Sequence, residues 1–250
     1  MDSSKHKDLN LPREERLLLA ILVVAFILRL WSVNFGLPYL YHADEPIVVN
    51  HALAYGAGDF NPHFFKIPPL VSYLLFGCYG AFFMIGRITG FFHSSQDLEQ
   101  MFFLDPTIFY LIARIVFGTL LGTSSVYLLW RIVKRFWDPK IALWASFFFA
   151  VNFLHVRDSH YIYSDIPLVF VLLLGFTVNY RIADGEIPTK SNGCSRPVKL
   201  HLLAGAMIGL ATAVKYNGAF LAIPYMWVSF RNISWKKCPW AYLCAGTKIL

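Results

Sequence analysis

The sequence predicts an all-α polytopic membrane protein, and three observations support that fold class. Hydrophobic residues fill 57% of the 250 positions and charged residues only 15%, whereas an ordinary soluble domain carries about 25% charged residues. The apolar residues form long blocks, and a helix of about 20 such residues can cross the hydrocarbon core of a bilayer. Aromatic residues reach 17%, and Trp and Tyr often stand near block ends, as they do at membrane interfaces.

The basic residues and the cysteines exclude several other classes. The formal net charge is +7, but Lys and Arg stand in short connections between apolar blocks, where they act as topology signals. We therefore expect no nucleic-acid partner. The cysteines form no CxxC pair and no metal-ligand spacing, so they predict neither a disulfide framework nor a zinc site. They are Cys78, Cys194, Cys238 and Cys244.

The chain begins with a polar, basic tail and a first crossing. Residues 1–16 are expected on the cytoplasmic side, and residues 17–35 form an apolar run that only Arg29 interrupts. A secretory signal peptide is the alternative, but no small-x-small cleavage site follows the run. We expect 17–250 to form one transmembrane module, in which 36–105 is an outer loop that carries interfacial or re-entrant helices.

Later apolar blocks define the other crossings. They run over residues 69–92, 106–130, 140–156, 166–180, 200–214 and 218–230, and a last block begins near Pro239 and continues to Leu250. If every block crossed, the basic connections at 131–140 and 181–199 would lie outside, against the positive-inside preference. The conflict disappears if 69–92 lies in the interface or re-enters the membrane. Its glycines, Gly77, Gly80, Gly86 and Gly90, suit a bent or closely packed element of that kind.

This topology brings separated polar stations to the outer face of the membrane. They are Asp44 with Glu45, the stretch from His155 to Asp165, and the neighbourhood of Lys215. Convergence on one side is what an active site at the membrane surface needs.

Two acidic positions each have a structural and a functional interpretation. Asp44, Glu45 and Pro46 fit the start of a helix, with Asp44 at the N-cap. One of the two carboxylates could also be a general base that deprotonates an acceptor hydroxyl or amine. Asp165, followed by Pro167, is likewise either an N-cap or a site residue.

Two cations near or within apolar blocks are candidates for anion binding. Lys215 follows a long apolar run at an outer helix end, where a snorkelling lysine is the simpler explanation. Arg114 stands deeper, and intramembrane arginines pair with an anion. A phosphate group suits either cation.

A metal site is the remaining chemical alternative. His42, His51, His63, His155 and His160 fall in predicted outer segments, alongside Asp44, Glu45 and Asp165. Histidines with carboxylates can hold a transition metal, but the spacings match no ordered motif. We expect no cofactor, with a divalent metal as the less favoured possibility. The chain has no Gly-rich phosphate loop, no GxSxG and no HExxH.

Four sequence elements in order resemble a known family. They are Asp44-Glu45 with Gly58-Asp59-Phe60-Asn61-Pro62 and Pro68-Pro69-Leu70; Ala113-Arg114; Ser159 to Asp165; and Gly205, Gly209-Leu210-Ala211 and Lys215. Together they are similar to family 39-like glycosyltransferases, which are related to protein O-mannosyltransferases and lipid A aminoarabinose transferases. The resemblance covers about residues 17 to 230. Many relatives have Lys-Pro-Pro in the first loop, whereas this chain has Lys66-Ile67-Pro68-Pro69.

The resemblance implies a GT-C-like helix bundle that transfers a sugar from a polyprenyl phosphate on the extracytoplasmic face. It implies that Asp44 is the catalytic base and that Glu45 supports it. Arg114 and Lys215 would contact the lipid phosphate, and Asp165 would shape a substrate pocket. The acceptor would be a lipid, a glycan or a protein, and the membrane a bacterial or archaeal cell membrane.

Three expectations stay open at this point. Family members continue with further crossings, so the chain could be the N-terminal portion of a longer enzyme. A transporter is the alternative function, with Arg29, Arg114 and Lys215 along its pathway. A catalytically inactive scaffold subunit is the third possibility.

Overall fold

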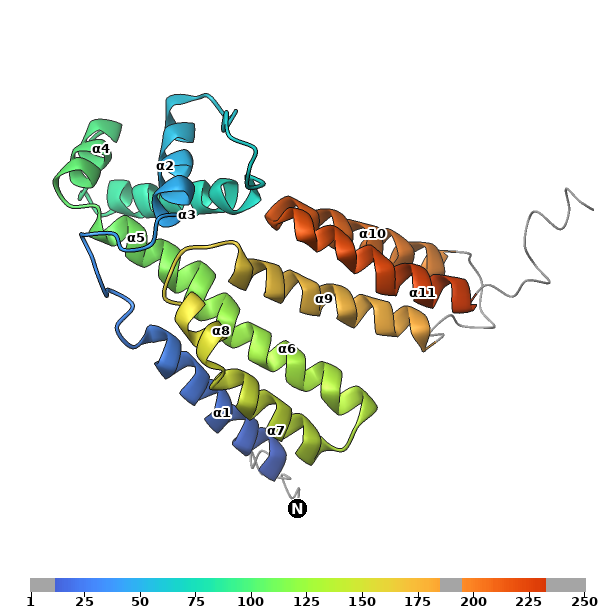
Figure 1. Ribbon diagram of the computed structural model, residues 1–250. Coiled ribbons are helices and arrows are strands. Elements are labelled where there is room, and N and C mark those ends of the chain that lie inside the picture. The colour runs from blue at the N-terminus through green and yellow to red at the C-terminus, as the bar shows by residue number, and fades with distance from the viewer. Residues whose placement is uncertain (1–11, 185–194, 233–250) are drawn as a thin grey trace, which may run out of the picture. The chain divides into compact units, whose positions relative to one another are not determined.

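The computed structural model describes residues 12–184 and 195–232, and all regular elements in those ranges are helices (Figure 1). The chain divides into two compact units. The first contains the residues up to Asn61 and Ser72–Phe170, and the second contains Pro62–Val71 and the chain from Val171 onward. We describe each unit by itself. The block predicted near Pro239 lies outside the described residues.

The first helix, α1 (Arg13–Leu30), starts and ends earlier than the predicted crossing at 17–35. It begins within the predicted tail because acidic side chains in its first turn suit the positive end of the helix dipole. It ends because the chain turns sharply after Leu30, with positive φ angles at Ser32 (59°) and Gly36 (81°). A Cβ at Gly36 would lie 2.5 Å from the ring of Tyr41, so this turn requires glycine.

One long helix replaces the predicted crossing at 106–130. It consists of α5 (Thr107–Ala113), a π-helical segment η2 (Arg114–Leu120) and α6 (Leu121–Phe136). The helix therefore extends through the basic residues that the sequence assigned to a connection, because nothing before Trp137 breaks it.

The predicted crossing at 140–156 is wrong as a single helix. It is divided into α7 (Pro139–Ala150) and α8 (Phe153–Asp158). The break occurs because the Asn152 side chain accepts a hydrogen bond from the backbone N–H of His155 (3.0 Å) and starts a new helix.

The helices α1, α6 and α7 lie side by side in the first unit (Figure 1). Near the start of α1, Leu18 packs with Trp130 of α6. Beyond the other end of α1, the Val33 carbonyl accepts a hydrogen bond from Arg114 (2.8 Å). Since α1 and the α5–α6 helix run in opposite directions, residues 36–106 leave and rejoin this pair at the same end.

That intervening segment holds α2 (Glu45–Ala54), the 3₁₀ turn η1 (Tyr55–Ala57), α3 (Leu70–Ile88) and α4 (Ser95–Leu104). Helix α3 is continuous and is set at an angle to α1 and α6 (Figure 1). Of the glycines predicted to pack closely in this helix, Gly86 does so, because a Cβ there would lie 2.1 Å from the Phe92 ring. Gly77 and Gly80 face open space.

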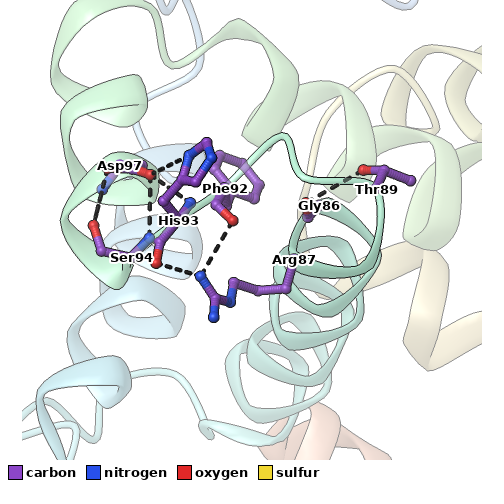
Figure 2. A network of polar contacts seen from close by, with 7 residues as sticks. All are labelled: Gly86, Arg87, Thr89, Phe92, His93, Ser94 and Asp97. Carbon is purple, nitrogen blue, oxygen red and sulfur yellow. Dashed lines mark hydrogen bonds and ion pairs between the residues drawn. The ribbon is translucent and has the colours of Figure 1, made fainter.

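A polar network closes the connection from α3 to α4 (Figure 2). The Arg87 guanidinium donates to the carbonyls of Phe92 and His93. Ser94 and Asp97 form a capping box, in which the Asp97 carboxylate accepts from the backbone N–H groups of His93 (2.6 Å) and Ser94 (3.1 Å). The network fixes the start of α4 after the turn.

The second unit contains the latter part of α9 (Asp165–Ala183) with α10 (Ser195–Val214), η3 (Tyr216–Leu221) and α11 (Ala222–Asn232). Its core includes Val178, Ile182 and Ala204. The predicted blocks at 166–180 and 200–214 thus lie in helices, while 218–230 is divided between η3 and α11.

Residues Pro62–Val71, from the segment predicted to be an outer loop, also belong to this second unit. The Tyr216 hydroxyl donates to the carbonyl of Phe65 (2.6 Å). A Cβ at Gly218 would lie 2.2 Å from the backbone of Ala211, so η3 folds back tightly on the end of α10.

Three described helices are long and apolar enough to cross a membrane: Leu70–Ile88, Thr107–Phe136 and Asp165–Ala183. Helix α7 and Lys199–Val214 are shorter apolar helices. The all-helical architecture confirms the predicted fold class of an all-α membrane protein.

Candidate functional site

A buried ion pair joins two of the predicted site residues. Glu45 is the first residue of α2, and Arg114 is the first residue of the π-helical segment. The Arg114 Nε donates to Glu45 Oε1 (2.8 Å), and Nη2 donates to Oε2 (2.7 Å). The Glu45 side chain is 0% exposed and the Arg114 side chain is 1% exposed. A two-pronged Arg–carboxylate contact of this kind is both strong and geometrically specific.

Further hydrogen bonds place this pair at the junction of four segments. Arg114 Nη1 donates to the carbonyls of Val33 and Phe35, both at 2.8 Å, in the turn after α1. Glu45 Oε1 also accepts from the backbone N–H of Ile162 (3.0 Å). The anion that Arg114 meets in this structure is therefore a carboxylate of the protein, whereas the sequence prediction gave it a phosphate.

Asp44 has different surroundings from its neighbour. It occupies the predicted N-cap position of α2, but its side chain makes no capping hydrogen bond. The residue is partly exposed, and its carboxylate forms no hydrogen bond or ion pair with the described part of the chain. An acid that is held in place by its backbone but has no protein partner is available to accept a proton.

An aromatic cluster lies beside Asp44. The His42 ring centroid is 4.9 Å from that of Tyr161 and 5.5 Å from that of Tyr163. His42 Nδ1 accepts from the backbone N–H of Asp44 (3.3 Å), so a neutral His42 carries its proton on Nε2. The Arg114 guanidinium carbon lies 5.5 Å from the Tyr161 ring centroid.

The sequence motifs do not reveal this cluster. The available signal was that an aromatic residue stands two positions before each of two acidic residues, His42 before Asp44 and Tyr163 before Asp165. Aromatic faces suit the apolar faces of sugar rings, because both surfaces lose contact with water when they stack.

Asp165 and Lys215 lie in different units. Asp165 is the first residue of α9 and is partly exposed, just after the Ile162 contact to Glu45. Lys215 precedes η3 in the second unit, and its carbonyl accepts from the N–H of Gly218 (2.7 Å). The structure thus brings Asp44, Glu45 and Arg114 together with the loop that leads to Asp165.

Arg29 forms a second buried contact at the same end of the first unit. It is fully buried, and it donates to the carbonyls of Ala25 (2.9 Å) and Ala150 (3.0 Å) and to His155 Nδ1 (2.8 Å). This contact joins α1 to α7 and α8. Arg29 therefore stabilises helix packing rather than facing an open pathway.

The predicted histidines do not gather around one point. His160 contacts the carbonyls of Trp31 and Val156, and His51 contacts the carbonyl of Ile47 in its own helix. Within residues 12–184 and 195–232, no group of at least three His, Cys, Asp or Glu side chains is arranged to hold a metal ion.

Apolar helices with buried charges at one end define an integral membrane protein that has a candidate polar site at a helix-bundle terminus. The chain belongs to the family described as dolichyl-phosphate-mannose-protein mannosyltransferases, whose model matches residues 17–243. This match confirms the resemblance inferred from the sequence motifs and makes the protein a glycosyltransferase by class. Comparison with curated proteins gave no match, and comparison with solved structures gave none.

Proposed function

We propose that the protein transfers a sugar, with mannose as the first candidate, from a polyprenyl-phosphate donor to a hydroxyl acceptor on the extracytoplasmic face. The family match supports the donor class and the reaction type. The observation that carries the site assignment is the contrast between Asp44 and Glu45. Glu45 is fully engaged by Arg114 and Ile162, whereas the Asp44 carboxylate has no partner in the described chain.

In this proposal Asp44 is the general base. The acceptor hydroxyl oxygen attacks the anomeric carbon of the sugar while the bond from that carbon to the phosphate oxygen breaks. The electron pair of the broken bond leaves with the polyprenyl phosphate, and the hydroxyl proton passes to Asp44. General base catalysis of this type contributes about 10²–10⁴-fold to a rate.

Glu45 and Arg114 act together as positioning residues. Their contact fixes the start of α2, and hence the backbone of Asp44, against the turn after α1 and the loop at Ile162. Precise placement matters because a small displacement of a catalytic group lowers the rate steeply. Arg114 thus supports the base in place of contacting the donor phosphate.

The remaining site residues have roles in donor and acceptor binding. Lys215 is proposed to contact the departing phosphate, since an ammonium group stabilises the charge that develops there. Asp165 and the rings of His42 and Tyr161 would line the sugar pocket. The Lys215 and Asp165 assignments rest on the motif resemblance, and those of His42 and Tyr161 on the ring contacts.

The donor class can be tested with purified protein in proteoliposomes. Radiolabelled dolichyl-phosphate mannose and GDP-mannose are supplied separately with a peptide that contains Ser and Thr. The proposal predicts transfer of label to the peptide from the lipid-linked donor alone. Transfer from GDP-mannose alone would contradict the donor assignment. Label on glycan or lipid acceptors but not on the peptide would mean that the acceptor is not a peptide hydroxyl.

A further inference from the structure

A groove of about 810 Å³ is lined by residues of α1 and α7, within the first unit. Most of its walls are apolar, formed by Leu17, Ile21, Val24, Leu143, Trp144 and Phe147. Several of these side chains are exposed, including Leu17 (47%) and Trp144 (62%). Within a membrane, such walls contact acyl chains in place of water.

Charged residues lie at one end of the groove. Arg13 at the start of α1 and Lys140 at the start of α7 both line it. Glu14 also lines the groove, but its carboxylate lies 3.9 Å from the Lys134 ammonium, which offsets its charge. Lys134 in turn stacks over the Trp130 ring at 4.5 Å. Arg13 and Lys140 therefore leave net positive charge at this end of the groove.

The length of the groove indicates which kind of molecule it can hold. From Arg13 to Val24 the helix rises about 17 Å, at about 1.5 Å per residue. One leaflet is half of a hydrocarbon core of about 30 Å, so it is about 15 Å thick. The groove thus has the depth of one leaflet, with cations at the headgroup level, whereas a transmembrane partner helix would need a groove about twice as long.

We propose that this groove binds one anionic glycerophospholipid from the leaflet on the side of the predicted cytoplasmic tail. The lipid phosphate would lie between Arg13 and Lys140, and an acyl chain would follow Leu17 and Val24 toward the bilayer centre. Basic residues at the cytoplasmic surface attract anionic lipids. The site is separate from the proposed reaction, because Asp44 lies beyond the opposite end of α1.

Native mass spectrometry of the full chain, titrated with phosphatidylglycerol or phosphatidylcholine, tests this inference. The wild type is expected to retain phosphatidylglycerol with a preference on the order of ten-fold over phosphatidylcholine, since two cations contribute. The double variant Arg13→Gln/Lys140→Gln should lose that preference. The matched control Arg16→Gln/Arg131→Gln removes the same charge from outside the groove and should keep it. In a chain that keeps Arg13 and Lys140, the substitution Ala20→Phe fills the groove and should reduce binding of both lipids.

Three results would overturn the proposal. Equal retention of both lipids by the wild type would show that the cations do not select the headgroup. If both double variants lost the preference for phosphatidylglycerol equally, that preference would come from general surface charge. Competition by a polyprenyl phosphate that displaces phosphatidylglycerol more effectively than added phosphatidylglycerol would make the groove a donor-lipid site.

Discussion

Asp44 and Glu45 are adjacent in the sequence, but their carboxylates meet different surroundings. Glu45 accepts from Arg114 and from the backbone of Ile162 and is fully buried. Asp44 is partly exposed and occupies the N-cap position of the same helix, but its carboxylate makes no capping hydrogen bond. One residue is therefore suited to position the site, and the other to accept a proton.

Removing one charge of the buried pair should destabilise the protein strongly. Glu45→Gln leaves the Arg114 guanidinium buried without its counter-charge, which costs about 3–5 kcal/mol. The double variant Glu45→Gln/Arg114→Gln removes both charges and should lose less stability than the sum of the single variants. Thermal unfolding in nanodiscs, followed by intrinsic fluorescence, measures all three. Additive losses would mean that the two side chains do not interact.

The sequence identified the residues of this pair but not the pairing. Arg114 within an apolar block indicated an anionic partner, and the acidic pair at 44–45 was visible. However, Glu45 and Arg114 are separated by 69 positions, and no local rule relates residues that far apart. The motif resemblance suggested a phosphate partner for Arg114, whereas the folded chain supplies the carboxylate.

At the scale of elements, the long α5–α6 helix packs unusually closely against the loop at Ser159. A Cβ at Gly118 would lie 2.0 Å from the Ser159 carbonyl oxygen, and a Cβ at Gly122 would lie 2.8 Å from the Ser159 hydroxyl and 2.9 Å from Arg29 Nε. The absence of side chains at these positions lets the loop that carries Ile162 approach Arg114. The π-helical segment begins at that point, and such segments are frequent at functional sites.

Gly118→Ala should therefore destabilise the first unit, because the added methyl group meets backbone that cannot rotate away. Overpacking of this kind costs about 1–3 kcal/mol. Gly80→Ala is the control, since a Cβ there meets nothing within 4 Å and alanine favours a helix by about 0.5–1 kcal/mol. Melting temperatures of the two variants should move in opposite directions. A Gly118→Ala variant as stable as the wild type would contradict the close approach.

The capping box of α4 should respond to pH. Hydrogen bonds from the His93 backbone and from Ser94 lower the pKa of Asp97 below its ordinary value of 3.8. A lowered folded pKa stabilises α4 above the unfolded pKa, and this contribution is lost as the pH falls through the folded pKa. A spin label at Glu99→Cys should become more mobile below about pH 4. In the Asp97→Asn background the label mobility should not change with pH, and a transition that persists there would assign the effect to another group.

Element boundaries were predictable where the apolar pattern ended and not where side chains capped the backbone. The blocks at 166–180 and 200–214 correspond to helices. The break in 140–156 depends on one hydrogen bond, which the Asn152 side chain accepts from the His155 N–H within an apolar sequence, so periodicity could not reveal it. The extension of α6 to Phe136 reflects helix-compatible basic residues that the topology rule placed in a connection.

At the scale of the whole molecule, the path of the chain bears on membrane topology. The segment from 36 to 106 leaves α1 and enters α5 at the same end of the pair, as the contacts of Leu18 with Trp130 and of Arg114 with Val33 require. A single crossing by α3 would bring the segment to the opposite end. We therefore retain the prediction that α3 lies in the interface or re-enters the membrane, although its length would suffice for a crossing.

Cysteine labelling tests that topology directly. In a cysteine-free background, Ser95→Cys in α4 should react with a membrane-impermeant reagent from the side that carries Asp44. Trp137→Cys, between α6 and α7, should react from the opposite side. Both positions are exposed. Labelling of Ser95→Cys from the side opposite Asp44, together with labelling of Trp137→Cys from the side of Asp44, would mean that α3 crosses.

We propose Asp44 as the base of a lipid-linked sugar transfer. The most direct measurement is mannosyl transfer from dolichyl-phosphate mannose in proteoliposomes by the wild type, Asp44→Asn and the control Glu99→Gln, which removes one charge from exposed α4. We expect Asp44→Asn to lose about 10²–10⁴-fold in rate with an unchanged melting temperature, and Glu99→Gln to retain wild-type activity. An Asp44→Asn variant that transfers mannose at the wild-type rate would contradict the assignment of Asp44 as the base.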